Sequence, residues 1–270
     1  METLAAFVRA HPRLFVLTGA GVSTGSGIPG YRDADGCWRR KPPITHQEFL
    51  RSDAARRRYW ARSLVGWPAI AGAAPNAAHD ALARLEHAGR VASLVTQNVD
   101  GLHQRAGSRE VIDLHGRLDG VVCVSCAAKL ARAAVQSAME RTNPGFAQRA
   151  GLRAPDGDAD LDGDCEGFEA PACPDCGGIL KPDVVLFGDG VPRPRVAAAF
   201  AALSGADAVL IVGSSLMAYS GYRFCERARE ARRPIVAINR GRTRADELLQ
   251  FKLDDDCLPV LAALADELAH

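Results

Sequence analysis

The stretch LTGAGVSTGSGIPGYRD, residues 17–33, decides the fold class of this chain. It continues an apolar run and places Gly19 and Gly21 where a strand would end. A glycine-rich turn after a buried strand is typical of α/β folds that bind a dinucleotide, because glycine lets the backbone approach a pyrophosphate at a helix N-terminus. The third glycine, Gly25, stands one position later than in the usual motif, so the residues that follow need their own explanation.

The segment after this turn, Pro29-Gly30-Tyr31-Arg32, favours a loop over a continued helix, because proline and glycine are typical turn residues. In common dinucleotide folds an acidic residue about 20 positions further on holds a ribose at the end of a second strand. No such residue is recognisable here. We therefore expect the segment to leave the sheet and fold over the other end of a dinucleotide.

Five apolar runs rich in β-branched residues recur along the chain, with helical stretches between them. Such runs are typical of parallel strands buried on both faces of a sheet. They are Arg13–Gly19, Val91–Asn98, Glu110–Gly116, Asp207–Ser215 and Arg233–Gly241. Their carboxyl ends carry Gly19, Ala20, Gly21, Gln97, Asn98, Asp100, His115, Gly213, Ser214, Ser215 and Asn239. Because open α/β sheets bind ligands at that edge, we predict one crevice on a Rossmann-like parallel sheet.

Bulk composition limits the class of protein. The chain has 270 residues, 47% hydrophobic and 24% charged, enough for one large domain or one domain with a small satellite. A net charge of +1 provides no overall field to attract nucleic acid or a membrane, and two basic stretches, residues 37–41 and 55–62, favour solvated surfaces. No apolar run approaches the about 20 residues of a membrane span. Met1 should lead almost at once into the first strand, without a signal peptide, so we expect a cytoplasmic protein.

Two Cys-x-x-Cys pairs interrupt the pattern of strands: Cys123 with Cys126, and Cys173 with Cys176. Four thiolates in two such pairs are typical of a tetrahedral Zn²⁺ site. A redox pair or two buried cysteine pairs are the alternatives. Because no histidine or acid accompanies the four sulfurs, we expect one structural zinc ion, with residues 127–172 folding out as an excursion that returns. The other cysteines, Cys37, Cys165, Cys225 and Cys257, show no such pattern.

Part of this excursion matches a calcium-loop pattern. The matching residues are Asp158, Asp160, Asp162, Gly163 and Glu169. A calcium loop of this type needs a helix on each side, but Pro155 and Pro171 break both flanks. The pattern therefore favours a solvated acidic loop.

Taken together, these motifs resemble those of the sirtuins, the NAD⁺-dependent protein deacylases of the silent information regulator 2 type. The resemblance covers residues 18–257, in the motifs GAGVSTGSGIPGYR, TQNVDGLH, LHG, the cysteine pairs, KPDVVLFGD, VGSSL and IN. YWARSLVGWP, GLRAPDGD and SLMAYSGYRF look like class II, and in particular the mitochondrial sirtuin 4 branch. The chain departs from the family at Gly25, Gly30 and Ser220, where glutamate, aspartate and proline respectively are common.

The resemblance implies a domain organisation and two cofactors, NAD and one structural zinc ion. A Rossmann-like domain would comprise residues 1–30, 76–118 and 183–270, with a cofactor loop and helical module at 31–75 and a zinc-binding module with an acidic insertion at 119–182. The implied NAD-binding residues are Gly19, Ala20, Gly21, Ser23, Ile28, Tyr31, Arg32, Gln97, Asn98, Asp100, Gly213, Ser214, Ser215, Asn239, Arg240, Gly241 and Cys257.

The resemblance also implies the chemistry. Nicotinamide would enter a pocket closed by Ile28, Asn98 and Asp100, and the acyl group of a lysine would pass to ADP-ribose. His115 would take a proton from the ribose hydroxyls, with Asn98 and Asp100 as further catalytic residues. A neutral imidazole near pH 7 is suited to this task. The alternative for His115 is a histidine that caps the turn before Gly116.

The substrate peptide is expected to pair as a strand between residues 185–189 and 215–219, with Val185, Phe187 and Gly188 in contact. Tyr59 and Arg62 share a helix face and resemble the pair that grips acidic acyl groups in some sirtuins, so succinyl- or glutaryl-lysine is the expected preference over acetyl-lysine. The alternative is a surface arginine on a basic helix.

Three other functions stay open at this stage. An NAD⁺-dependent mono-ADP-ribosyltransferase would use the same cofactor pocket. A hydride-transfer oxidoreductase is disfavoured because Asp100 and His115 would crowd the nicotinamide. A zinc-ribbon binding module would leave the polar strand ends without a purpose.

Overall fold

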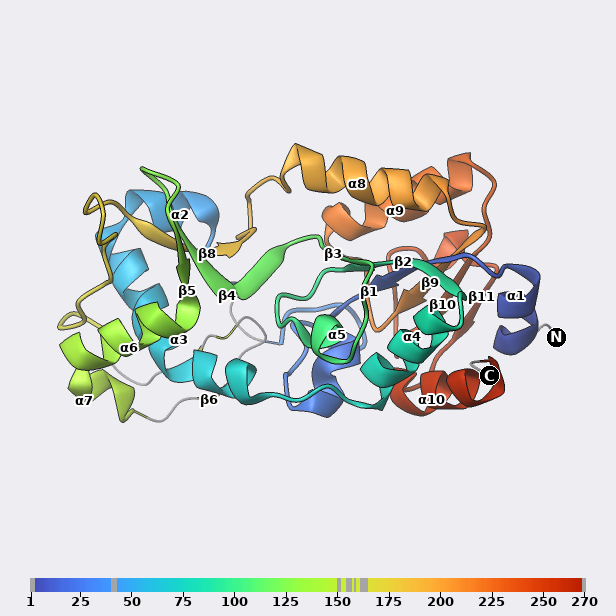
Figure 1. Cartoon of the computed structure of the whole chain (residues 1–270), viewed down its shortest axis with the longest axis horizontal. Helices are drawn as coiled ribbons and strands as arrows, with labels where there is room; N and C mark the ends of the chain where they lie inside the picture. Colours follow the sequence, from blue (N-terminus) through green and yellow to red (C-terminus); the bar gives the residue numbers. More distant parts are fainter. Residues whose placement is uncertain are drawn as a thin grey trace.

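The computed structural model describes residues 3–39, 43–149, 152–153, 157, 159–160 and 165–268. Within these residues a six-stranded sheet has the order β11-β10-β9-β1-β2-β3, and every neighbouring pair is parallel. This sheet forms the core of a larger lobe, which lies beside a smaller lobe along the long axis of the molecule (Figure 1). The strands are β1 Leu14–Thr18, β2 Val91–Thr96, β3 Val111–Asp113, β9 Ala208–Val212, β10 Ile235–Ile238 and β11 Phe251–Leu253.

The five predicted runs all form strands of this sheet. The central strands β1 and β9 are buried along their whole length, as expected for apolar runs covered on both faces. The structure differs from the sequence prediction in two details. The helix α1, Leu4–Ala10, precedes β1, with Thr3 as its N-cap, so the chain does not begin with a strand. The edge strand β11 was not predicted, because it has three residues and carries Lys252 at its centre.

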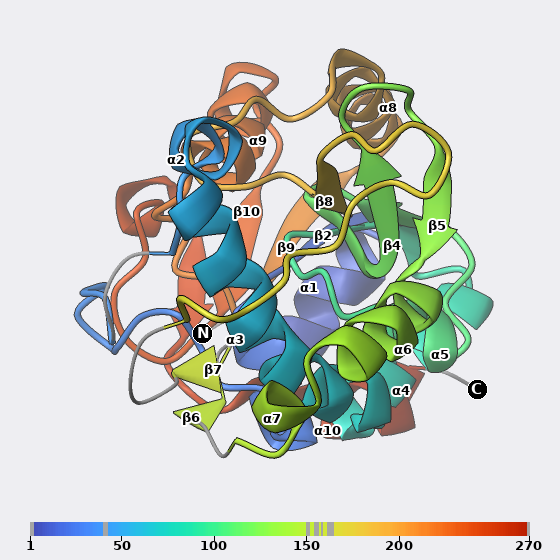
Figure 2. The same ribbon diagram turned by 90° about the vertical axis from the view of Figure 1, so that its left-hand side faces the viewer.

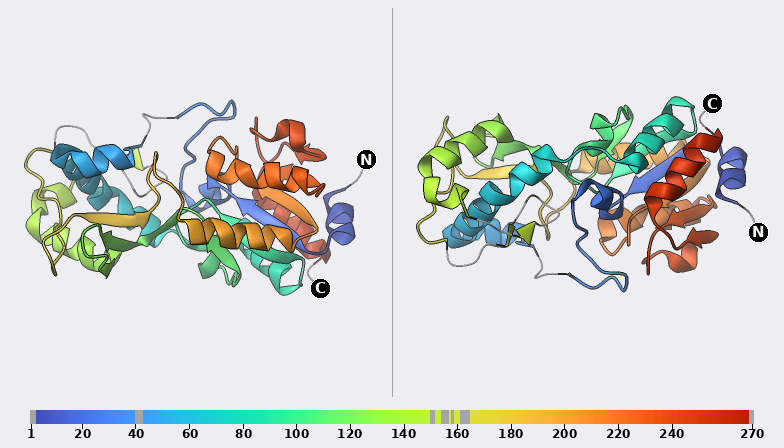
Figure 3. Two further views of the ribbon diagram at one scale, coloured as in Figure 1. Left: turned by 90° about the horizontal axis from the view of Figure 1, so that it is seen from above. Right: turned by 90° about the horizontal axis from the view of Figure 1, so that it is seen from below.

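Helices cover both faces of the sheet (Figures 1 and 3). On one face, α8 (Arg193–Ser204) and α9 (Tyr219–Glu230) pack on Phe15, Val209 and Ile211. On the other face lie α1, α4 (Ala77–His87) and α10 (Cys257–Leu268), which share a core with β1 and β9. The two termini lie at the end of the molecule far from the smaller lobe.

The smaller lobe has an antiparallel sheet at its centre. Its order is β5-β4-β8, with β4 Gly116–Cys123, β5 Lys129–Ala131 and β8 Leu180–Val184. Helices α2 (His46–Arg51), α3 (Asp53–Gly72), α6 (Arg132–Thr142) and α7 (Pro144–Ala147) pack around it, as Figure 2 shows. Its core includes the fully buried Phe49, Trp60 and Phe168. The chain therefore leaves this small sheet after β5, passes through α6 and α7, and returns to the sheet at β8. This path matches the excursion predicted between the two cysteine pairs.

The acidic insertion is described only in part. The short strands β6 (Leu152–Arg153) and β7 (Ala159–Asp160) pair with each other in the antiparallel sense. Three residues of the calcium-loop pattern, Asp158, Asp162 and Gly163, lie outside the described residues. Among the residues that are described, no helix is long and apolar enough to cross a membrane.

Candidate functional site

The glycine-rich turn brings the ends of β1 and β9 into direct backbone contact. Gly21 donates a hydrogen bond to the Gly213 carbonyl at 2.8 Å. A Cβ at Gly21 would lie 2.7 Å from the Gly213 Cα, and Gly213 itself has a φ of +57°. Both positions therefore require glycine. The turn continues as a 3₁₀ helix, Ala20–Ser26, whose first residues lie at the carboxyl edge of the sheet.

A cavity of about 870 Å³ opens above this edge, between the two lobes. Its volume is in the range of small-molecule and cofactor sites, about 300–1,000 Å³. The predicted site residues that line it are Gly19, Ala20, Gly21, Tyr31, Arg32, Tyr59, Gln97, Asn98, His115, Val185, Phe187, Gly188, Gly213, Ser214, Ser215, Asn239, Arg240 and Cys257. The fold thus brings most of the predicted residues to one place.

Five predicted residues do not line this cavity: Ser23, Ile28, Asp100, Gly241 and Arg62. Ser23 and Asp100 lie directly behind Asn98, which does line it. Asn98 donates to Ser23 Oγ at 3.0 Å and to the Gly19 carbonyl at 3.1 Å. Ser23 in turn donates to Asp100 Oδ2 at 2.8 Å, and the N–H of Leu102 donates to Oδ1 at 2.9 Å. In this structure Ser23 and Asp100 fix the amide of Asn98.

His115 follows β3 and lines the cavity. Its Nδ1 lies 2.8 Å from the carbonyl oxygen of Gln97, and its Nε2 lies 2.8 Å from Ser220 Oγ. A carbonyl only accepts hydrogen bonds, so Nδ1 carries the ring proton and the lone pair is on Nε2. Burial lowers the pKa of His115, the hydrogen bond to the Gln97 carbonyl offsets part of this, and the positive charges of Arg195 and Arg223 lower the pKa further. The ring is therefore neutral near pH 7, as a general base must be.

Two further histidines lie beneath this edge, and sequence reasoning assigned them no role. The rings of His79 and His103 are 4.8 Å apart, and His103 Nε2 lies 3.0 Å from Thr18 Oγ1, at the end of β1. Burial lowers the pKa of His103 to about 3. The position of His103 in the TQNVDGLH motif, three residues after Asp100, was the signal available for it.

The loop after the turn closes one side of the cavity with aromatic rings. Tyr31 and Trp38 from this loop pack edge-on against Phe187, at ring distances of 5.9 and 5.3 Å. The guanidinium carbon of Arg32 lies 3.9 Å from the centre of the Trp38 ring, and Arg32 donates to the Gly36 carbonyl at 2.7 Å. The expected loop is therefore present, and Trp38 is a lining residue that sequence reasoning missed.

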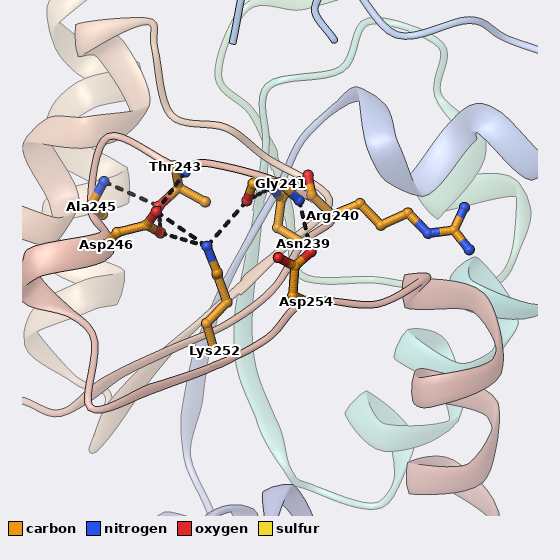
Figure 4. Close-up of polar contacts among 8 residues, drawn as sticks. All are labelled: Asn239, Arg240, Gly241, Thr243, Ala245, Asp246, Lys252 and Asp254. Carbon is orange, nitrogen blue, oxygen red and sulfur yellow. Dashed lines mark hydrogen bonds and ion pairs between the residues drawn. The ribbon is translucent and has the colours of Figure 1, made fainter. Parts of the chain in front are cut away.

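The far end of the cavity is held by a polar network after β10 (Figure 4). Lys252 donates to both carboxylate oxygens of Asp246 at 3.1 Å and to the Gly241 carbonyl at 3.2 Å. Asp254 accepts from the Gly241 N–H at 2.8 Å, and Asn239 donates to the Arg240 carbonyl at 2.9 Å. Gly241 thus fixes the turn that presents Asn239 and Arg240 to the cavity.

The predicted substrate segment also lines the cavity and is tied to His115. The N–H of Val185 donates to the His115 carbonyl at 2.8 Å. On the other side, the N–H of His46 donates to the Phe187 carbonyl at 2.8 Å, so α2 supports the segment. Tyr59 of α3 lines the cavity, whereas Arg62 of the same helix is half-buried away from it.

The four cysteines meet in the smaller lobe, as predicted. Their sulfur atoms all lie within 4.8 Å of one another, with Cys123 and Cys176 3.5 Å apart and Cys126 and Cys173 3.7 Å apart. Zn–S bonds of about 2.3 Å in a tetrahedron place sulfurs about 3.8 Å apart, so the cluster fits one Zn²⁺. All four ligand positions are taken by sulfur, which makes the zinc site structural.

Comparisons with known proteins agree with this geometry. The model of the Sir2 family matches residues 19–220. An NAD-dependent protein deacetylase of Xanthomonas campestris pv. campestris (strain 8004) is 58% identical over 262 residues, which are 97% of this chain and 89% of that protein. One from Bordetella bronchiseptica is 59% identical over 263 residues, 97% of this chain and 96% of that protein.

Solved structures are similar over nearly the whole chain. A Sir2 with a p53 peptide and NAD⁺ has a TM-score of 0.79 at 27% identity, covering 96% of this chain and 95% of that one. A further Sir2 enzyme has a TM-score of 0.77 at 32% identity, covering 98% and 95% respectively.

Proposed function

The chain belongs to the Sir2 family and is an NAD-dependent protein deacetylase, and from this premise we propose how its residues divide the work of the reaction. The observation that carries the proposal is the single cavity at the carboxyl edge of the sheet, where the glycine turn, Asn98 and His115 meet. We place the pyrophosphate over Gly19, Ala20 and Gly21 and beside Ser214 and Ser215. The adenosine ribose lies near Asn239 and Arg240.

NAD⁺, when bound, supplies the ribose carbon that takes the acyl oxygen as nicotinamide leaves. Asn98 orients the nicotinamide of NAD⁺ in the cavity. Ser23 and Asp100 hold the Asn98 amide group in place from behind. In this proposal Asp100 acts through Asn98, because its carboxylate accepts from the Ser23 hydroxyl that holds the Asn98 amide. Tyr31 and Arg32 cover the cofactor and exclude water from the reacting carbon.

His115 is the general base of this proposal. It is neutral, its lone pair is on Nε2, and its ring lies in the cavity wall. A ribose hydroxyl placed against Nε2 loses its proton to the ring, and its oxygen can then receive the acyl group. A base in this position typically contributes about 10² to 10⁴ in rate.

We propose that an acylated protein lysine enters between residues 185–189 and 215–219, as a strand held mainly by backbone hydrogen bonds. Support comes from a solved Sir2 bound to an acetylated peptide, which is 27% identical and has a TM-score of 0.78. The class II assignment and the division into three sequence modules remain proposals that rest on the motifs of the sequence, and a cytoplasmic location also remains a proposal.

A preference for acidic acyl groups is part of the proposal and rests on Tyr59 and Arg62. Tyr59 lines the cavity, which supports a role in the acyl pocket. Arg62 is one turn further along α3, so it must swing toward the cavity to meet a distal carboxylate. A second guanidinium, that of Arg132 on α6, is buried against the rings of Trp60 and Trp67 on α3.

A panel of acyl-lysine peptides tests the proposed function. Acetyl-, succinyl- and glutaryl-lysine versions of one peptide are incubated with the protein and NAD⁺, and all products are identified by mass spectrometry. We expect free lysine peptide, nicotinamide and acyl-ADP-ribose in equal amounts. ADP-ribose attached to protein, with no acyl-ADP-ribose, would favour a mono-ADP-ribosyltransferase instead.

A further inference from the structure

The nitrogen of His115 that would receive the proton already has a partner. Ser220 Oγ lies 2.8 Å from Nε2, and since Nε2 holds the lone pair, the hydroxyl donates. Ser220 is half-buried and lines the cavity. A hydroxyl of this chain therefore occupies the place that a ribose hydroxyl must take.

The packing of α9 holds this serine in register with the ring. Ser220 is the second residue of α9, and a Cβ on the next residue, Gly221, would lie 2.5 Å from the Gln97 side chain. The carbonyl of the same Gln97 accepts from Nδ1 of His115, and its side-chain amide donates to Ser214 Oγ at 2.7 Å. Gln97 thus fixes the ring from one side and the start of α9 from the other.

The charges around the ring disfavour its protonated form. Arg195 on α8 and Arg223 on α9 both act on His115 through their positive charge. The carboxylate of Asp113 on β3 is engaged by Gln104, which donates to its two oxygens at 3.0 and 2.9 Å. The ring itself is hydrogen-bonded to a carbonyl and a hydroxyl, both uncharged. The Gln97 carbonyl accepts from Nδ1–H, so an imidazolium formed here still needs an acceptor for Nε2–H.

A hydroxyl meets this need because it can donate and accept. It donates to the neutral ring and, after rotation, accepts from Nε2–H of the protonated ring. Hydrogen bonds in which one partner is ionised are stronger than neutral ones. Ser220 therefore stabilises the imidazolium more than the imidazole.

We propose that Ser220 is a positioning residue of the base: it keeps Nε2 directed into the cavity, gives up its hydrogen bond to the lone pair when the ribose hydroxyl takes that place, and accepts from Nε2–H once the ring is protonated. The proposal rests on the role of His115 given above. In the step itself, the O–H bond of the ribose hydroxyl breaks and the Nε2–H bond forms. Ser220 keeps its own proton throughout and changes from donor to acceptor.

The test compares Ser220→Ala and Ser220→Thr in the pH profile of kcat with an acetyl-lysine peptide and NAD⁺. We expect Ser220→Ala to lower kcat by about three- to tenfold, since it loses the bond to a charged group. We also expect its acidic limb to move to lower pH by roughly half a unit, because the imidazolium loses its partner. Ser220→Thr keeps the hydroxyl and should restore both. Ser204→Ala, on the exposed end of α8, is the matched control.

Two results would overturn the inference: an acidic limb in Ser220→Ala identical to that of the wild type, or a Ser220→Thr variant that behaves like Ser220→Ala. Thermal unfolding of each variant separates a folding defect from a change at the base. His115→Ala is measured in parallel. If it retains full acyl transfer, the proposed base itself is wrong, whereas loss in His115→Ala with a normal Ser220→Ala removes only the role of Ser220.

Discussion

The two lobes that form the cavity are stabilised in different ways. In the larger lobe, β1 and β9 are fully buried beneath helices on both faces, so apolar packing alone accounts for a stable core. In the smaller lobe, β5 is a three-residue, largely exposed strand, and the turns at both cysteine pairs meet at four sulfurs. His115 and the glycine turn thus lie at the edge of the larger lobe, whereas the four cysteines lie in the smaller one.

Removal of the zinc ligands should give the largest difference between the two lobes. Structural Zn²⁺ contributes about 10–16 kcal/mol of apparent binding free energy in small zinc modules, so Cys173→Ala with Cys176→Ala should abolish deacetylation and metal binding. The larger lobe should keep its fold and still bind NAD⁺. Metal analysis, circular dichroism and calorimetric titration with NAD⁺ measure the three quantities. One equivalent of zinc retained in the double variant would refute the cysteine site.

Acid should destabilise the larger lobe through His103. Unfolded histidine takes up a proton below about pH 6.5, whereas the buried ring of His103 stays neutral down to a pKa of about 3. The free energy of unfolding is therefore highest above pH 6.5 and falls as the pH drops toward 3, by up to about 5 kcal/mol from this residue alone. Urea unfolding at several pH values measures it.

The variant His103→Gln sharpens that measurement. It should flatten the fall in stability between pH 6.5 and 3, even if it lowers stability at pH 7. His87→Gln, at the exposed end of α4, should leave the slope unchanged. A wild-type slope in His103→Gln would show that other groups drive acid unfolding.

A smaller effect is expected where β1 and β9 touch. Gly21→Ala places a methyl group 2.7 Å from the Gly213 backbone, and forcing extra carbon into a packed site costs about 1–3 kcal/mol. Because the same backbone forms the floor of the cofactor cavity, the Kd for NAD⁺ should rise by about tenfold or more. Gly72→Ala, where an added Cβ meets nothing within 4 Å, is the control. Equal NAD⁺ affinity in both variants would mean that the close approach is unimportant for binding.

The sequence predicted the larger lobe better than the smaller one, for a physical reason. Buried parallel strands read as continuous apolar runs, and their carboxyl ends meet at one edge, where His115 and Asn98 both line the cavity. The edge strand β11 gave no such run. Around the smaller lobe, Trp38 reaches the cavity through tertiary packing on Phe187, which no local pattern encodes. Arg62 was expected at the acyl pocket from its spacing to Tyr59 and from the resemblance, but it does not line the cavity.

The smallest expected effect concerns this arginine. If Arg62 swings toward the cavity when an acidic acyl group binds, Arg62→Met should lower the ratio of succinyl to acetyl turnover by about tenfold, the loss of one charge-assisted pair. Competition assays with equal amounts of both peptides give the ratio directly. Arg57→Met, on the same helix, should leave it as in the wild type. An unchanged ratio in Arg62→Met would show that Arg62 belongs only to the helix surface.

The central claim is that the larger lobe carries the chemistry through His115, acting after nicotinamide has left. The most direct test measures two rates in His115→Ala: exchange of labelled nicotinamide into NAD⁺ in the presence of acetyl-lysine peptide, and formation of acetyl-ADP-ribose. We predict that the variant binds NAD⁺ and exchanges nicotinamide, while acyl transfer falls by about 10² to 10⁴. Acyl transfer at the wild-type rate, or loss of exchange and transfer together by the same factor, would contradict this account.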